Sequence, residues 1–163
     1  MKKIVLLAAL GALAWWVFVD GSKLDEAVIR ERVETEVQAF TAMDAETLCR
    51  GLASEYSSKS TVHVGSTKRV TTRNKEQTCA EMQDFFRQTE MILANIGGEL
   101  TVDVEIKSIK LSPDRKSAEV EVRSVMNIAG MKVVTRSVDT LIRERRRVLA
   151  LSSVGRGWSE FEP

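Results

Sequence analysis

The sequence predicts an α+β protein, in which an apolar N-terminal helix precedes one domain of helices packed on an antiparallel sheet. Three observations carry this prediction. An uninterrupted apolar run occupies residues 4–19, apolar residues then recur at helical spacing, and strict alternation begins after residue 98. Periods of 3.6 and 2 residues are typical of helices and strands respectively. Since helices come first and the turns between strands are short, we expect antiparallel neighbours covered by helices on one face.

The apolar N-terminal segment predicts export. Lys2 and Lys3 precede a run from Ile4 to Val19 that contains no polar residue, which is typical of an export signal. Lysines remain on the cytoplasmic side, so the rest of the chain is expected beyond the membrane, in the periplasm. The pair Trp15-Trp16 suits the headgroup region and favours a retained inner-membrane anchor.

Two alternatives to the anchor stay open. The small-x-small pattern Ala12-Leu13-Ala14 would allow cleavage and leave a soluble periplasmic domain. A buried N-terminal core helix is the second alternative, although the lysine flank fits it poorly. We therefore expect a signal-anchor or signal peptide over residues 1–21 and a single domain over residues 22–163.

Composition and charge exclude several classes of protein. The 163 residues suffice for one hydrophobic core. Because 24 basic residues balance 23 acidic ones, no overall field attracts nucleic acid. We expect no nucleic-acid partner. Cys49, Cys79 and the lone His63 are too few for a zinc site without carboxylates, so no metal and no cofactor is expected.

The two cysteines predict a disulfide. Their even number in an exported chain favours the pair Cys49–Cys79, which would join two predicted helices. Two separate buried thiols are the alternative. No Cys-x-x-Cys motif supports redox catalysis.

The first predicted helices follow the apolar run directly. We expect one to begin with Ser22 as its N-cap and to reach Phe40, with its apolar face marked by valines. A second, short helix is capped by Asp44 and ends near Ala53. The polar stretch 56–72 predicts an irregular hairpin or a pair of short strands.

The second half of the domain predicts a long helix and then strands. The helix runs from Thr72 or Asn74 to Asn95, and Gly97-Gly98 end it. The alternating strands that follow cover about 102–106, 118–124, 131–144 and 148–154. Gly155-Arg156-Gly157 is expected to interrupt the last strand, and 158–161 to extend the sheet edge.

This order of elements resembles the nuclear transport factor 2-like, SnoaL-like superfamily, with a cystatin-type arrangement as the competing fold. The residues that carry the resemblance are the helix pair 24–52, the segment 56–72, the helix 75–95 and the strands from 100 to 154. The resemblance implies a curved sheet that wraps a helix into a cone-shaped barrel with a pocket. It also implies functions from isomerases, dehydratases and cyclases to non-enzymatic binding modules, and homodimers that pair through the open sheet face.

No catalytic signature stands out, and three weak candidates remain: Tyr56, His63 and Asp139. His63 alternates with two valines and is expected at the surface. Asp139 shares a strand face with Thr135 and Ser137, and this face would line either a polar pocket or solvent. Tyr56 points either a hydroxyl into a pocket or a ring into the core.

The run Arg143-Glu144-Arg145-Arg146-Arg147 is read in two ways. It is either a patch for an anion, a phospholipid headgroup or a protein partner, or a solvated turn that discourages edge pairing. Together these observations favour a membrane-tethered, non-enzymatic module that binds a protein partner or a small apolar ligand in its helix–sheet cleft. The alternative is a pocket enzyme of the isomerase, dehydratase or cyclase kind.

Overall fold

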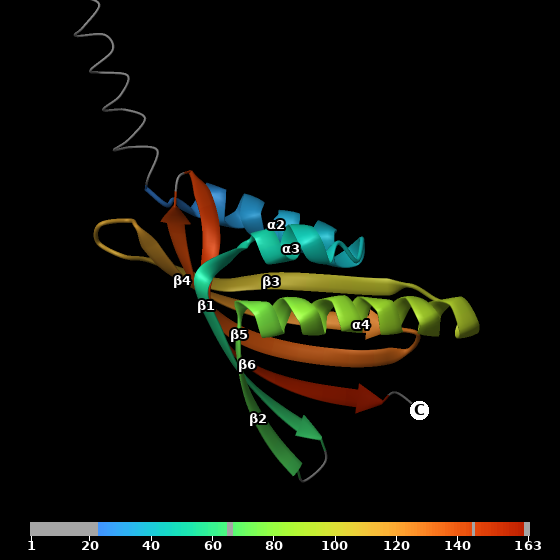
Figure 1. The fold of residues 1–163 in the computed structure, drawn as a ribbon. Coiled ribbons are helices and arrows are strands. Elements are labelled where there is room, and N and C mark those ends of the chain that lie inside the picture. The colour runs from blue at the N-terminus through green and yellow to red at the C-terminus, as the bar shows by residue number, and fades with distance from the viewer. Residues whose placement is uncertain (1–22, 65–66, 145, 162–163) are drawn as a thin grey trace, which may run out of the picture.

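A computed structural model describes residues 23–64, 67–144 and 146–161 of the chain (Figure 1). The expected apolar helix and membrane segment, with Ile4, Trp15, Trp16 and Val19, lies outside the described residues. Among the residues that are described, no helix is long and apolar enough to cross a membrane.

Three helices are capped by side chains that the sequence provides. Helix α2 spans Glu26–Thr41 and α3 spans Ala45–Arg50, and the carboxylates of Asp25 and Asp44 accept hydrogen bonds from their first-turn amides. Helix α4 spans Lys75–Ile96 behind an Asn74 capping box. The N-cap of α2 is therefore Asp25 and not Ser22. The Asp25 carboxylate accepts a hydrogen bond from the backbone amide of Val28, three residues later.

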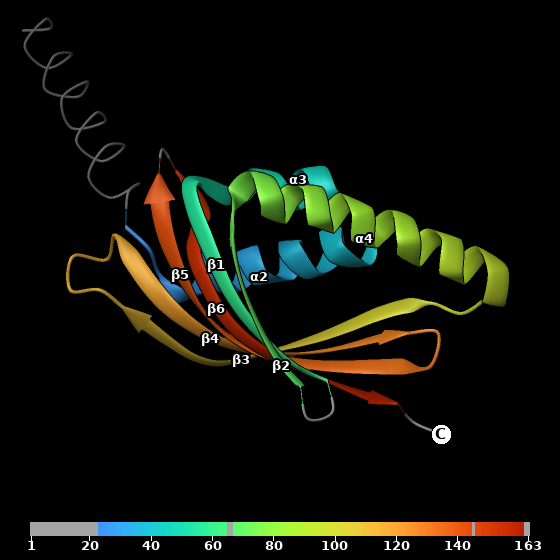
Figure 2. The ribbon, with the colours of Figure 1, turned by 60° about the horizontal axis from the view of Figure 1, so that its bottom comes forward.

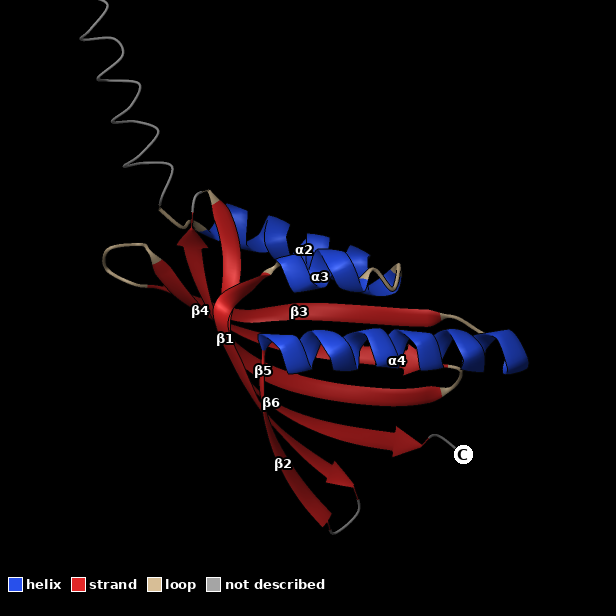
Figure 3. Cartoon of the chain, in the orientation of Figure 1, coloured by secondary structure: helices blue, strands red, loops and turns tan. Residues whose placement is uncertain are grey.

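Six strands form one sheet with the order β2-β1-β6-β5-β4-β3. Their bounds are β1 Leu52–Val64, β2 Thr67–Asn74, β3 Leu100–Leu111, β4 Ser117–Ile128, β5 Met131–Glu144 and β6 Arg147–Phe161. The predicted antiparallel meander is confirmed for β3 to β6. Strand β6 also pairs with β1, and this pairing is parallel. The sheet is therefore mixed, and it is curved (Figure 3).

Two sequence predictions about these elements are wrong, and a third is confirmed except for its expected irregularity. The short second helix ends at Arg50 and not near Ala53, because Leu52 already begins β1. The predicted hairpin is present but regular, since β1 and β2 pair at eight consecutive positions. Gly155 and Gly157 do not interrupt β6, which lies inside the sheet between β1 and β5.

All three helices lie on one side of the sheet, as Figure 2 shows. Leu24 and Ile29 are fully buried against Val120 and Leu141, so the start of α2 is fixed to the strands. A smaller cluster of Ala39, Leu48 and Phe86 joins the helices to one another. The concave face is thus the covered face, and the convex face is not covered by any described element.

Cys49 on α3 and Cys79 on α4 lie at disulfide distance, with Cα atoms 5.7 Å apart. This separation fits the geometry of a disulfide. The pair links the short helix to the first turns of the long one, on the covered side of the sheet.

Candidate functional site

A cavity of about 430 Å³ lies between α2 and the concave face of the sheet. This volume falls within the range of small-molecule pockets. Apolar side chains form most of its lining: Val33, Val37, Phe40, Leu48, Val102, Val104, Val122 and Met126. Polar side chains form the rest: Glu36, Ser124, Thr135, Ser137, Asp139 and Ser153.

The alternation of β5 delivers the polar part of this lining. Thr135, Ser137 and Asp139 share one face of the strand and all three line the cavity, so their face is the concave one. Neighbouring strands add hydroxyls in register: Ser153 of β6 lies opposite Asp139, and Ser124 of β4 lies opposite Thr135. The polar face that the sequence singled out therefore faces a cavity rather than solvent.

Asp139 is the central titratable group of the cavity. Its carboxylate accepts a hydrogen bond from the Ser137 hydroxyl at 3.1 Å. Burial raises the pKa of Asp139, while hydrogen bonds from Ser153 and Ser137 and the charge of Arg32 act in the opposite direction. The net direction is upward, so the protonated form persists to a higher pH than in an exposed aspartate.

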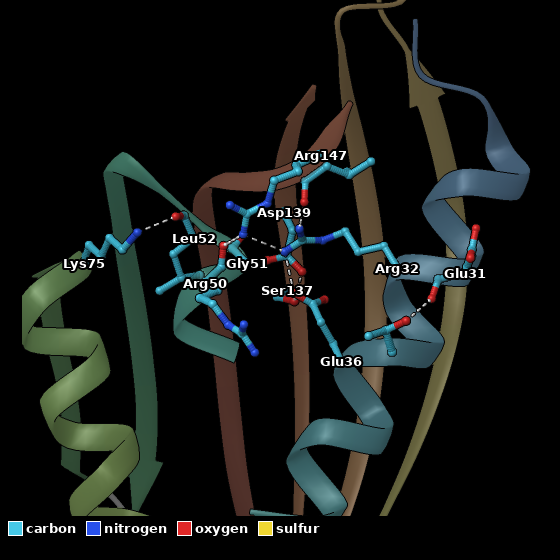
Figure 4. Close-up of polar contacts among 12 residues, drawn as sticks. Glu31, Arg32, Glu36, Arg50, Gly51, Leu52, Lys75, Ser137, Asp139 and Arg147 are labelled. Carbon is cyan, nitrogen blue, oxygen red and sulfur yellow. Dashed lines mark hydrogen bonds and ion pairs between the residues drawn. The ribbon is translucent and has the colours of Figure 1, made fainter. Parts of the chain in front are cut away.

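Arg32 of α2 holds the neighbouring polar cluster together (Figure 4). Its side chain is only 8% exposed and forms an ion pair with Glu36, one helical turn later. The guanidinium also donates to the carbonyl oxygen of Gly51 at 3.1 Å and to that of Val148. One buried cation therefore joins α2 to the start of β1 and to β6.

Glu36 links Arg32 to the cavity. Burial raises the pKa of Glu36, Arg32 lowers it, and the charge of Asp139 raises it again. The side chain of Glu36 is 38% exposed, so solvent screens the interaction of its charge with Arg32 and Asp139. Two carboxyl groups thus lie at the polar end of the cavity with one arginine beside them.

Tyr56 lies near Asp139, whereas His63 does not. Tyr56 is buried, and burial together with the charge of Asp139 raises the pKa of its phenol. Hydrogen bonds with Ser58 and Ser153 lower this pKa, so Tyr56 and Asp139 share Ser153 as a partner. His63 lies seven residues further along β1, opposite Trp158 in β6, and its side chain is outside the described part.

In the arginine run, two of the described side chains donate to backbone carbonyl oxygens of neighbouring segments. Arg143 donates to the carbonyl of Lys23, and Arg147 donates to the carbonyl of Arg50 at 2.8 Å. Arg146 has a positive φ of 69° in the turn between β5 and β6. Arg145 lies outside the described residues. Two of these side chains therefore fix neighbouring backbone segments.

Within the described residues, no group of three or more His, Cys, Asp or Glu side chains is arranged to hold a metal ion. Sequence reasoning did not single out Arg32, Glu36 or Ser153. An Arg and a Glu four residues apart on a helix are typical of an exposed ion pair. Only the position of Arg32 between Val28 and Val33, on the face that turns toward the sheet, distinguishes it from such a pair.

Known structures show which fold this is. A nuclear transport factor 2-like protein of unknown function from Shewanella oneidensis has a TM-score of 0.60 and 14% identity, over 80% of this chain and 97% of that one. A second one, from Silicibacter pomeroyi, has a TM-score of 0.55 and 19% identity, over 80% and 92%. A ketosteroid isomerase-like protein from Erwinia carotovora has a TM-score of 0.52 and 12% identity, over 86% and 100%.

At these identities the likeness concerns the fold alone. The chain has the nuclear transport factor 2-like fold, with helices packed on a curved six-stranded sheet. No protein-family model matches the sequence, and no curated protein does. The fold alone does not define the function.

Proposed function

We propose that the domain binds a small, largely apolar molecule in the cavity between α2 and the sheet, without chemical turnover. The proposal rests on the separation of the cavity lining into an apolar part and a polar end. Eight apolar side chains surround one polar end, where Asp139, Ser137 and Ser153 gather. An apolar body would be taken from water by the first group, and a hydroxyl or amide would be oriented by the second.

A neutral fluorescent probe tests this proposal. 2-Naphthol has an apolar body and one hydroxyl donor, which matches the two parts of the lining. We expect saturable binding by the full-length protein, and Ser137→Leu should weaken it at least tenfold because leucine fills the cavity floor. Val138→Leu is the matched control, since the next residue on β5 is exposed on the opposite face. Equal binding by both variants would contradict the proposal.

A second candidate function is acid–base catalysis, which the raised pKa of Asp139 favours. A carboxyl group with a raised pKa inside an apolar cavity can exchange a proton with a bound molecule at a higher pH than an exposed aspartate can. This would suit an isomerase or dehydratase. Against it, the described lining holds no histidine, and Tyr56 reaches Asp139 only through the shared Ser153.

Nuclear magnetic resonance separates the two functions. The carboxyl carbon of Asp139, assigned by comparison with Asp139→Asn, should titrate above the ordinary range of aspartate. Catalysis also requires turnover of a simple test substrate, such as the isomerisation of cyclohex-3-enone to its conjugated isomer cyclohex-2-enone. Asp139→Asn should abolish this turnover. An ordinary titration would remove the support for this second function.

We also propose that the chain is exported and held at the inner membrane by residues 1–21. Lys2, Lys3 and the unbroken apolar run support this, and so does the placement of Cys49 and Cys79 at disulfide distance, which suits an oxidising compartment. The domain would then capture its ligand at the membrane.

A fusion tests this location. Alkaline phosphatase joined after Pro163 should be active, because that enzyme folds only outside the cytoplasm. The fusion should sediment with membranes and keep its full length. An inactive fusion that is nonetheless well expressed would contradict export, and an active but soluble, shortened one would contradict the anchor.

A further inference from the structure

Three arginines form a row across the convex face of the sheet. In the register of β4, β5 and β6, Arg123 lies directly opposite Arg136, and Arg136 lies directly opposite Arg156. Ser124, Thr135 and Ser137 are next to Arg123 and Arg136 and line the cavity on the concave side, as does Ser153, three residues before Arg156. Alternation therefore places the three arginines on the other face. This is the face that no described element covers (Figure 2).

The charges of this row are only partly balanced within the domain, because Glu121 lies on the same face of β4 two residues from Arg123 but no ion pair forms. In the described part of the chain, none of the three arginines forms an ion pair. Glu105 lies opposite Arg123 at one end, and that charge contributes to lowering the pKa of Glu105. Arg136 and Arg156 have no such carboxylate in register. Like charges directly opposite one another destabilise a sheet, and an anion placed over them would remove this repulsion.

On β5 and β6, apolar side chains border the row on both sides. Val138 and Val154 are paired two residues to one side, with 44% and 56% of their surface exposed. Val134 and Trp158 are paired two residues to the other side, and Trp158 is 38% exposed. A cationic stripe between two apolar stripes is complementary to a partner with the same pattern and opposite charge. Nucleic acid offers no apolar flanks of this kind.

We propose that this face, which we call the arginine-row face (Arg123, Arg136, Arg156 and the four flanking apolar residues), binds an acidic amphipathic helix of a protein partner. Adjacent strands are about 4.8 Å apart, so the row extends over about 10 Å. Carboxylates at positions i, i+4 and i+7 of a helix share one face and span about 10.5 Å. One helix laid along the row can thus place an acidic side chain on each arginine and apolar ones on the flanks.

A designed peptide tests this proposal. The probe is a fluorescein-labelled, alanine-based peptide of about 16 residues, long enough to form a helix. It carries Glu at i, i+4 and i+7 with Leu on both sides, and a matched peptide carries Gln instead. Fluorescence anisotropy is measured with the full-length protein in a non-ionic detergent at low salt. We expect the Glu peptide to bind at least tenfold more tightly than the Gln peptide.

Variants locate the binding. Arg136→Gln should weaken the Glu peptide about tenfold, and Arg136→Gln with Arg156→Gln should weaken it further. Arg87→Gln is the matched control, because Arg87 is an exposed arginine on α4, on the other side of the sheet. Arg136→Gln should unfold at the same temperature as the wild type or slightly above, since it relieves repulsion in the row.

Several results would overturn the proposal. Equal binding of the two peptides would exclude charge recognition, and an equal effect of Arg87→Gln would exclude this face. If duplex DNA or phosphatidylglycerol vesicles bind more tightly than the Glu peptide, and Arg136→Gln abolishes that binding, the partner is a nucleic acid or a membrane and not a protein helix. A dimer that forms through this face without any anion would mean that a second copy occupies it. An Arg136→Gln protein that unfolds below the wild type would contradict the unbalanced row.

Discussion

Replacement of Arg32 by methionine tests how the cavity is held together. Methionine replaces only the aliphatic part of the buried side chain and removes its charge and its donors. Two hydrogen bonds to backbone carbonyls are lost, at about 1.5 kcal/mol each for a charged donor. The partly exposed Glu36 loses its counter-ion, which adds at most about 1 kcal/mol after screening by solvent. The free energy of unfolding should therefore fall by about 3–4 kcal/mol.

Urea unfolding followed by circular dichroism measures this loss. Arg30→Met is the matched control on the same helix, because Arg30 is exposed and its ion pair with Glu26 is 3.6 Å long. The control should lose less than about 0.5 kcal/mol. A loss below about 1 kcal/mol in Arg32→Met, or equal losses in both proteins, would refute the idea that Arg32 joins α2 to Gly51 and Val148.

Three further predictions follow from the described contacts. Because burial raises the pKa of Asp139, the wild type loses stability as pH rises through that pKa. In denaturant titrations, Asp139→Asn should therefore gain stability relative to the wild type with increasing pH, by up to about 1.4 kcal/mol per pH unit. A stability difference that does not change with pH would contradict the raised pKa. Reduction of the Cys49–Cys79 pair should lower stability by about 3–4 kcal/mol, given a separation of 30 residues, and Cys79→Ser should make the protein insensitive to reductant; free thiols in the purified protein would exclude the bond. Val120→Ala should cost about 2 kcal/mol in thermal unfolding, since Val120 is 1% exposed, and an effect no larger than that of Val154→Ala would contradict its place in the core.

Local patterns in the sequence were sufficient for much of the fold. The alternation after Gly98 and the turn at Ala129-Gly130 lead directly to the antiparallel strands β3 to β5. Asp44 acts as the predicted helix cap, and the long helix begins directly after Asn74, one of its two expected starts. Each of these features depends on residues within one or two turns of each other, where propensity and capping decide the outcome.

Long-range pairing was not accessible in the same way. The parallel contact of β1 with β6 joins segments about ninety residues apart, and no local pattern encodes it. For β6, Gly155 and Gly157 read as a break in a strand. In the sheet both glycines face the concave side, beside Ser137 and Thr135 respectively, where a missing side chain leaves space.

The site was predicted only in part. The irregular polar face of β5 drew attention to Asp139, because a serine, a threonine and an aspartate on one face rarely belong to a packed core. Arg32 was missed because an arginine and a glutamate four residues apart on a helix usually form a solvated pair. Its burial depends on Gly51 and Val148, which only the folded sheet brings to it.

The most direct test of the proposed function is to observe where a ligand binds. The full-length protein is labelled at its valine methyl groups and titrated with 2-naphthol, while carbon–proton correlation spectra are recorded. We expect the methyl signals of Val37, Val104 and Val122 to move together to saturation, because these side chains line the cavity. The signals of Val138 and Val154 on the convex face should stay in place. Shifts confined to the convex face, or no shifts at saturating concentration, would contradict binding in the cavity.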